Sequence, residues 1–310
     1  MTAVSALRGV IPPLCTPLTP AGDVDVASLT RLVEHLLGAG VSGLFVLGST
    51  GEAAFLTDEQ RSLVVRTVAA IGGARVPVLA GAIDMTTPRV RRQVDAAVAA
   101  GADAVVVTAP FYTRTHPAEI ARHFRLIAQA SAVPVVAYDI PVAVGTRLDP
   151  DVLLDLAQEG ALAAVKDSSG DDAGLRRLVL GAQDRGLDGF SVLTGSELTV
   201  DAALGFGVDG CVPGLGNVDP AGYVRLAAQM RAGDPVAARA EQERLVGLFG
   251  MVEAGDPARM GRGSSALGAF KTALHLLRII DSPRTSDPYL PLDGPETATV
   301  RGHLERAGLL

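Results

Sequence analysis

The side chain best suited to covalent chemistry in this sequence is a lysine at the end of a short apolar run. Lys166 follows the run 163–165 and precedes the polar turn Asp167–Gly170, which predicts a buried strand that brings an amine to the edge of a sheet. Only Lys166 and Lys271 of the 27 basic residues are lysines. A desolvated lysine can lose its proton and act as a nucleophile, whereas arginine cannot. Lys166 is therefore a candidate Schiff-base residue, and a structural lysine paired with Asp167 is the alternative.

Two other segments could share a cavity with such an amine. The glycine-containing turn Gly48–Glu52 offers the hydroxyls of Ser49 and Thr50 together with free backbone N–H groups, which suits a bound carboxylate. Tyr138 ends another apolar run, and a phenol beside an amine can move protons in its reaction. An ordinary capped turn and a core tyrosine are the structural alternatives when each segment is considered alone.

Eight short apolar runs, separated by amphipathic helical patterns, are the elements that must position these groups. The runs are continuous, as is typical of parallel strands covered on both faces. The expected strands are 9–11, 43–47, 78–82, 104–108, 135–138, 163–166, 191–194 and 210–212. Eight such units predict an α/β fold, a (β/α)8 TIM barrel, whose reactive groups lie at the carboxyl ends of the strands. A doubly wound sheet is the alternative, but the early chain has no Gly-x-Gly-x-x-Gly turn.

The strand pattern stops after Met230. We therefore expect the barrel and its active site in residues 1–230 and a helical appendage, packed on the barrel, in residues 231–310. The appendage is expected to contain helices from Pro235 to about Met251, from Leu267 to Ile280 and from residue 295 onward. Lys271 falls in the second of these helices, where its apolar neighbours indicate a structural role.

Composition excludes several classes of function. A net charge of −7 with interspersed acids and bases argues against nucleic acid as a partner. Cys15 and Cys211 lie far apart, which argues against a disulfide framework and favours the cytoplasm. No signal peptide and no apolar run long enough for a membrane helix is recognised. The five histidines have no liganding spacing, so a metal-dependent aldolase is the weaker alternative.

Three motifs taken together resemble one known family. Gly48–Glu52, Tyr138–Pro141 and Val165–Gly170 are similar in type, order and spacing to segments of the dihydrodipicolinate synthase / N-acetylneuraminate lyase family. The resemblance covers nearly the whole chain. It implies a barrel with a helical C-terminal region, a homo-oligomer (tetramer or dimer), and a class I lyase that forms a Schiff base with pyruvate or another 2-keto acid. It implies no metal and no organic cofactor.

The resemblance also implies roles for individual residues. Lys166 matches the lysine that condenses with the keto carbon, and Tyr138 matches the tyrosine that shuttles protons. Thr50 matches a hydroxyl that relays protons and contacts the substrate. Tyr112 matches a tyrosine that, in synthase members, completes this relay from a neighbouring subunit. The expected substrate-binding residues are Gly48, Ser49, Thr50, Glu197 and Val212. The backbone of Val212 is expected beside the lysine.

Two departures from the family pattern bear on the substrate. Synthase members carry an arginine for the carboxylate of aspartate semialdehyde where this chain has Ala143, and sialic-acid lyases carry a second acid where it has Leu198. Loss of a bidentate arginine leaves a carboxylate unpaired. We therefore expect cleavage or dehydration of a 2-keto-3-deoxy sugar acid or a 4-hydroxy-2-oxo acid. Synthase activity and a non-catalytic keto-acid sensor are the alternatives, and the roles of Arg114 and Arg147 stay open.

Overall fold

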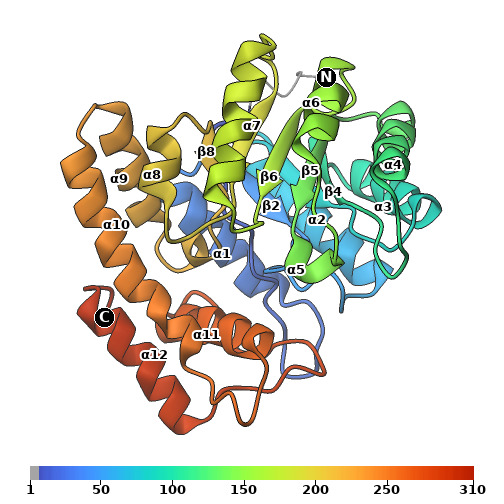
Figure 1. The fold of residues 1–310 in the computed structure, drawn as a ribbon. Helices are drawn as coiled ribbons and strands as arrows, with labels where there is room; N and C mark the ends of the chain where they lie inside the picture. The colour runs from blue at the N-terminus through green and yellow to red at the C-terminus, as the bar shows by residue number, and fades with distance from the viewer. Residues whose placement is uncertain (1–6) are drawn as a thin grey trace.

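Residues 7–310, which the computed structural model describes, build an eight-stranded parallel sheet at the centre of the molecule (Figure 1). The strands are β1 (Gly9–Val10), β2 (Leu44–Val46), β3 (Val78–Gly81), β4 (Ala104–Thr108), β5 (Val135–Asp139), β6 (Ala164–Asp167), β7 (Ser191–Thr194) and β8 (Gly210–Cys211). Each coincides with a predicted apolar run to within one residue at either end.

The sheet closes into a barrel. Its order is β1-β8-β7-β6-β5-β4-β3-β2, so strands β3 to β8 each pair with their neighbours along the chain. The outermost strands, β1 and β2, are joined by backbone hydrogen bonds: the Ser42 N–H donates to Val10 at 2.7 Å, and the Phe45 N–H donates to Pro12 at 3.1 Å. This closure confirms the predicted TIM barrel over the doubly wound alternative, since an open sheet would leave two free edges.

Helices cover the outside of the barrel between successive strands. They are α1 (Val26–Gly38), α2 (Asp58–Gly72), α3 (Thr87–Ala99), α4 (Pro117–Ala130), α5 (Pro141–Val144), α6 (Pro150–Gln158), α7 (Asp172–Asp184), α8 (Val200–Gly205) and α9 (Pro220–Arg231). The start of α2 is fixed by a capping box, in which the side chains of Thr57 and Gln60 each accept a hydrogen bond from the other's backbone N–H. Proline occupies the first turn of α3, α4 and α6, as their sequences predict.

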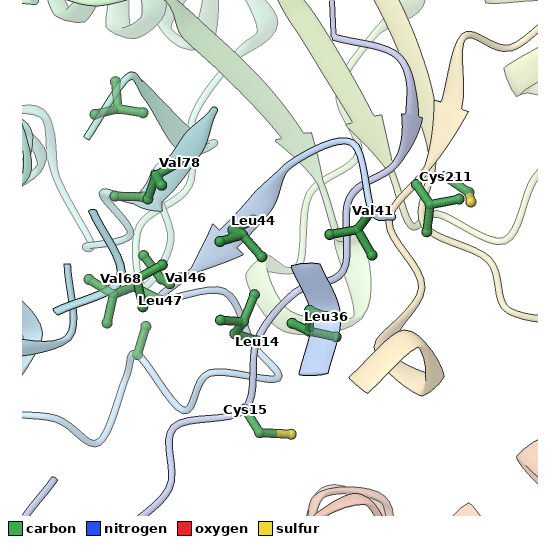
Figure 2. Close-up of a cluster of buried hydrophobic side chains, with 14 of the residues drawn as sticks. Leu14, Cys15, Leu36, Val41, Leu44, Val46, Leu47, Val68, Val78 and Cys211 are labelled. Carbon is green, nitrogen blue, oxygen red and sulfur yellow. The ribbon is translucent and has the colours of Figure 1, made fainter. Parts of the chain in front are cut away.

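Two apolar layers explain why the strands are apolar throughout. Ala104 and Val106 of β4 point into the barrel, while Val105 and Val107 belong to the layer under the helices. Figure 2 shows this outer layer, where Leu44 and Val46 of β2 lie near side chains from α1 and α2. Because both faces of each strand are buried, neither face tolerates a regular polar position.

The C-terminal residues form three helices that lie together beside the barrel (Figure 1). These are α10 (Pro235–Phe249), α11 (Arg262–Leu276) and α12 (Gly294–Arg306), with a short 3-10 turn η2 (Gly250–Glu253) after α10. A second 3-10 turn, η1 (Gly214–Asn217), lies between β8 and α9. The division of the chain near residue 230 stays a prediction, and its first six residues lie outside the described part.

The predicted bounds of the second C-terminal helix are wrong at both ends. It begins at Arg262 because Gly261 acts as its N-cap, so Gly263, which precedes the predicted start at Leu267, lies in the first turn. Tyr289 packs so closely on Gly263 that an added Cβ would lie 3.0 Å from the tyrosine oxygen. The helix ends at Leu276 because Arg278 adopts a left-handed φ of 60° and turns the chain away.

Both cysteines are buried free thiols. Burial raises the pKa of Cys15 and of Cys211 to about 12, so each stays protonated at neutral pH.

Within residues 7–310, no helix combines the length and the hydropathy that crossing a membrane requires.

Candidate active site

Four side chains form a row across the carboxyl ends of neighbouring strands. Thr108 of β4 pairs in register with Tyr138 of β5, Tyr138 with Lys166 of β6, and Lys166 with Leu193 of β7. Tyr138 and Leu193 belong to the apolar cluster that fills the barrel. Thr108 and Lys166 lie two residues after Val106 and Ala164 of the same cluster, and a strand's side chains alternate with a period of two, so they point into the barrel as well. Strand register, not proximity in sequence, therefore brings the amine and the phenol together.

Lys166 is enclosed by aromatic rings at this position. Lys166 is only 5% exposed. Nζ donates a hydrogen bond of 3.1 Å to the Tyr138 hydroxyl and lies 4.2 Å from the centre of that ring and 5.2 Å from the centre of Phe45. The rings of Phe45 and Tyr138 meet edge to face. These contacts hold the amine in one direction with little water around it.

Asp167 does not neutralise Lys166, contrary to the structural alternative. Consecutive strand residues point to opposite faces, so Asp167 lies on the outer side of β6. There its carboxylate lies 3.8 Å from the guanidinium of Arg147. The amine of Lys166 is therefore available to the interior of the barrel, where Tyr138 is its hydrogen-bond partner.

The turn Gly48–Glu52 follows β2 at the same end of the barrel. A Cβ at Gly48 would lie 2.8 Å from the Phe45 ring, so a glycine is required for this close approach. Ser49 is exposed and Thr50 half-buried. Glu52 itself adopts a left-handed φ of 57°, which is strained for a residue with a side chain. The conformation of the turn must therefore be imposed by contacts elsewhere.

The contact that imposes it comes from the C-terminal helices. The carboxylate of Glu52 forms an ion pair with Lys271 of α11, and neither side chain has any exposed surface. The Ser286 N–H donates to the other Glu52 oxygen at 2.5 Å, and Lys271 Nζ also donates to the Arg284 carbonyl at 2.8 Å. Sequence reasoning did not identify Glu52 as a positioning residue. The available signal was that the second of two lysines lies in a predicted helix whose nearby residues are mostly apolar.

Glu197 lies between the lysine and the turn after β8. Its Oε1 accepts a hydrogen bond of 2.8 Å from the Gly214 N–H. Burial raises the pKa of the Glu197 carboxyl above its ordinary value, and the Gly214 N–H and the nearby charge of Lys166 oppose this rise only in part. A Cβ at Gly214 would also lie 3.4 Å from Thr50 Oγ1, so Thr50 approaches the same turn. Val212 is buried in the barrel cluster, and its expected place beside the lysine stays a prediction.

A cavity of about 240 Å³ opens beside Tyr138. Its walls include three of the residues singled out from the sequence, namely Gly48, Ser49 and Tyr138, and also Ala143. Lys166 is not among its described lining residues but contacts the hydroxyl of Tyr138, which is. Thr108, Phe55 and Tyr289 line it too. These three were missed, because nothing in the local sequence places Phe55 or Tyr289 at the mouth of a barrel.

Tyr112 is a further predicted catalytic residue that does not line this cavity, as Lys166 and Thr50 do not. It is 95% exposed and has a left-handed φ of 63°. The cavity wall is formed instead by its neighbour Phe111. A proton relay through Tyr112 of a neighbouring subunit stays a prediction.

The comparisons with known proteins identify the family. The model of the dihydrodipicolinate synthetase family matches residues 6–307. The chain belongs to this family. The family resemblance read from the three motifs is confirmed, and with it a Schiff-base-dependent lyase that acts on carbon–carbon or carbon–oxygen bonds.

Individual relatives in the dihydrodipicolinate synthetase family cover nearly the whole chain. The 4-hydroxy-tetrahydrodipicolinate synthase of Kineococcus radiotolerans is 31% identical, over 99% of this chain and 96% of the relative. The Escherichia coli K12 prophage protein YagE, solved in complex with pyruvate, has 30% identity and a TM-score of 0.90, over 98% of this chain and 99% of its own. A monomeric dihydrodipicolinate synthase variant has 27% identity and a TM-score of 0.89, over 98% and 97%. The names of the curated relatives match the synthase alternative better than the predicted aldolase substrates.

Arg147 does not replace the arginine that is missing at position 143 of this family member. It points to the outer side of the barrel, where its guanidinium contacts Asp139 at 3.3 Å and Asp171 at 2.7 Å, and it is absent from the described wall of the cavity. Three aspartates, with Asp167 as the third, therefore hold it in place. Arg114 lies in the exposed loop after β4.

The described residues 7–310 contain no group of three His, Cys, Asp or Glu side chains able to hold a metal ion. The metal-dependent alternative has no donor set in this part of the chain.

A substitution of Thr108 tests whether the row of side chains at the strand ends takes part in substrate binding. Its hydroxyl is buried and has no hydrogen-bond partner within residues 7–310. Thr108→Val keeps the shape and removes an unsatisfied polar atom, so we expect a melting temperature equal to or above that of the wild type. If the hydroxyl binds substrate, kcat/KM falls about tenfold, the equivalent of one hydrogen bond. Thermal unfolding and steady-state kinetics measure the two effects, and a lower melting temperature with unchanged kcat/KM would assign Thr108 a structural role only.

Proposed function

We propose that this enzyme is a class I pyruvate-dependent aldolase that cleaves or dehydrates a 4-hydroxy-2-oxo acid or a 2-keto-3-deoxy sugar acid through an imine on Lys166. One observation carries the proposal: a buried amine, without an acidic partner on its own strand, lies 3.1 Å from the Tyr138 hydroxyl at the carboxyl end of the barrel. This is the geometry that an activated nucleophile and a proton shuttle require.

The proposed reaction begins with imine formation. The Lys166 amine adds to the keto carbon of the substrate, and the resulting carbinolamine loses water. Tyr138 donates the proton that leaves with this water and becomes a phenolate. The product is a protonated imine on Lys166, a cation that withdraws electrons from the adjacent carbon–carbon bond. The aromatic rings around Nζ stabilise the cation.

Cleavage then uses the same phenolate. It takes the proton of the C4 hydroxyl as the C3–C4 bond breaks, and the bonding electrons move into an enamine on Lys166. The aldehyde leaves, and Tyr138 returns the proton to C3. Addition of water to the imine releases pyruvate and restores the amine. A single phenol 3.1 Å from the nitrogen can serve every one of these transfers.

The turn after β2 is proposed to hold the carboxylate of the substrate. Ser49 and Thr50 supply hydroxyls and the turn supplies backbone N–H groups. The buried pair of Glu52 and Lys271 keeps the turn in its left-handed conformation. A group that binds without moving contributes most to orientation of the reacting atoms.

Synthase activity is the second candidate, and the names of the relatives favour it. Against it, aspartate semialdehyde brings a second carboxylate, and no basic side chain is among the described residues that line the cavity. An uncompensated carboxylate in such a cavity is strongly disfavoured. The sensor alternative is not favoured, because the family consists of enzymes.

The experiment that separates these candidates measures both the release and the consumption of pyruvate. Purified enzyme is incubated with a panel of 4-hydroxy-2-oxo acids and 2-keto-3-deoxy acids, and released pyruvate is assayed. In parallel, pyruvate consumption is measured with aspartate semialdehyde. Release from the panel supports the aldolase, whereas consumption only with aspartate semialdehyde would establish the synthase instead.

The raised pKa of Glu197 predicts an acid limb in the pH profile. Its carboxylate lies near Lys166 and stabilises the imine cation only when ionised. Since burial raises this pKa above the ordinary glutamate value, ionisation is lost at a higher pH than for a free glutamate, and activity falls as the pH decreases through it. In Glu197→Gln we expect lower kcat and no such limb. An unchanged acid limb in this variant would assign it to another group.

Assembly and location stay predictions. We propose an oligomer, a tetramer or a dimer, with Tyr112 of one subunit reaching the site of another, and a place in the reducing cytoplasm. The exposure and left-handed backbone of Tyr112 support the first proposal, and the free thiols support the second. One similar structure is a monomeric variant, so family membership does not decide the assembly. Light scattering measures it directly.

A further inference from the structure

We propose that the cavity beside Tyr138 selects substrates whose C4 substituent is a compact apolar group, with an aromatic ring preferred, over those that carry further hydroxyls or a second carboxylate. The inference rests on the proposed aldolase activity and narrows its substrate class. The corresponding product is pyruvate together with an apolar aldehyde.

The walls of the cavity carry the first argument. Most of the side chains around it are apolar or aromatic: Phe55, Ile83, Phe111, Ile140, Val144 and Tyr289. They come from loops after four strands and from the C-terminal region, so they surround the cavity on several sides. A substituent that leaves C4 away from Lys166 meets these side chains. Burial of an apolar group there is favourable, in proportion to the area removed from water.

The charges around the cavity carry the second argument. Glu52 is the one charged residue among the described lining residues, and its carboxylate is already paired with Lys271 and with the Ser286 N–H. It therefore offers neither a free acceptor for sugar hydroxyls nor a partner for a substrate cation. Arg147, the sequence candidate for binding a second carboxylate, is held by aspartates on the outer side of the barrel.

The supply of hydrogen-bonding groups carries the third argument. Of the polar side chains that line the cavity, Ser49 is assigned to the keto-acid carboxylate and Tyr138 to the C4 hydroxyl. Among the described lining residues, the hydroxyls of Thr108 and Tyr289 remain to bind any further hydroxyl of the substrate. A 2-keto-3-deoxy sugar acid carries hydroxyls on each carbon beyond C4, and these would face isoleucine, valine and phenylalanine. Hydrophobic pockets discriminate against an added hydroxyl by about 10²-fold.

An aromatic pair at the mouth indicates a preference for a flat ring. Phe55, which follows the turn after β2, packs on Tyr289 with ring centres 4.7 Å apart and planes tilted by 58°. Both rings also line the cavity. A third ring can add to such a pair in an offset or edge-to-face arrangement.

Matched substrates test the proposal. We would compare 4-hydroxy-4-phenyl-2-oxobutanoate, 4-hydroxy-2-oxohexanoate and 2-keto-3-deoxygluconate by coupled detection of pyruvate. The expected order of kcat/KM is phenyl, then ethyl, then the sugar acid, with about 10²-fold or more between the first and the last. An equal or higher value for the sugar acid would overturn the inference.

A pair of variants on α5 gives the matched control. Val144 lines the cavity, whereas Val142, two residues earlier, is 89% exposed and outside it. Val144→Ser is expected to lower kcat/KM for the phenyl substrate about tenfold and to narrow its advantage over the sugar acid. Val142→Ser is expected to change neither value. An equal effect of both variants would show that the helix, not the cavity wall, determines the result.

Trapping with pyruvate and borohydride separates this inference from the function on which it rests. If pyruvate does not label Lys166, the proposed aldolase chemistry fails. If Lys166 is labelled and the phenyl substrate is not cleaved, or is cleaved less well than the sugar acid, the inference about the substrate fails while the Schiff-base mechanism stands.

Discussion

Lys166→Arg is expected to abolish the covalent reaction with pyruvate and to lower kcat by roughly 10⁴-fold or more, as loss of a nucleophile does in other enzymes. Arginine keeps the positive charge and the long side chain but cannot lose its proton to form an imine. The aromatic contacts that enclose the wild-type amine suit a guanidinium as well, so the variant should fold. Loss of activity would then report the chemistry of the amine alone.

The measurement is borohydride reduction in the presence of pyruvate, followed by mass spectrometry. Wild-type protein should gain one reduced pyruvyl group per chain, and Lys166→Arg should gain none. Because the chain contains two lysines, peptide mapping assigns the adduct without ambiguity. Circular dichroism of the variant serves as the folding control. An adduct on Lys271, or normal turnover by Lys166→Arg, would refute the proposed nucleophile.

Lys271→Met is expected to lower the free energy of unfolding by about 3–5 kcal/mol, the usual result of removing one partner of a buried ion pair. The substitution leaves the carboxylate of Glu52 without its counter-charge at a place where neither side chain has exposed surface. The Ser286 N–H would remain as a hydrogen-bond donor to that carboxylate. The KM for pyruvate should rise as well, since Glu52 belongs to the turn that carries Ser49 and Thr50.

Urea denaturation of three variants tests this prediction. Arg75→Met removes an exposed ion pair with Glu34 and should cost at most about 1 kcal/mol. The double variant Lys271→Met with Glu52→Gln should recover part of the lost stability, because it no longer buries an unpaired charge. A loss in Lys271→Met no larger than that in Arg75→Met would contradict the structural role assigned to the pair.

The barrel could be predicted from the sequence because the burial of a strand is a local property, whereas the candidate roles of Lys166 and Tyr138 depended on the resemblance to the family. A strand with two buried faces is apolar along most of its length, so eight continuous runs indicate eight covered strands. Lys166 and Tyr138 each end such a run, and the barrel topology places strand ends at one edge. Their pairing then follows from register.

The helical tail shows where local reasoning fails. Gly261 and Gly263 are typical loop residues, yet α11 begins between them, with Gly261 as its N-cap and Tyr289 packed closely on Gly263. The ion pair of Glu52 with Lys271 could not be foreseen either, since the two residues are distant in sequence and both have ordinary neighbours. Such contacts depend on how the tail is placed against the barrel.

The sequence by itself therefore determined the fold class and placed an amine and a phenol at neighbouring strand ends, because patterns of burial and residue type are sufficient for that. Only the tertiary structure decided that Asp167 faces away from Lys166, that Arg147 is held outside the cavity and that Phe55 and Tyr289 form its mouth. The physical reason is that the chemistry belongs to individual side chains, whereas the substrate is selected by surfaces that several distant segments build together. Lys166 belongs to a single strand, whereas the cavity beside Tyr138 is built from several distant segments.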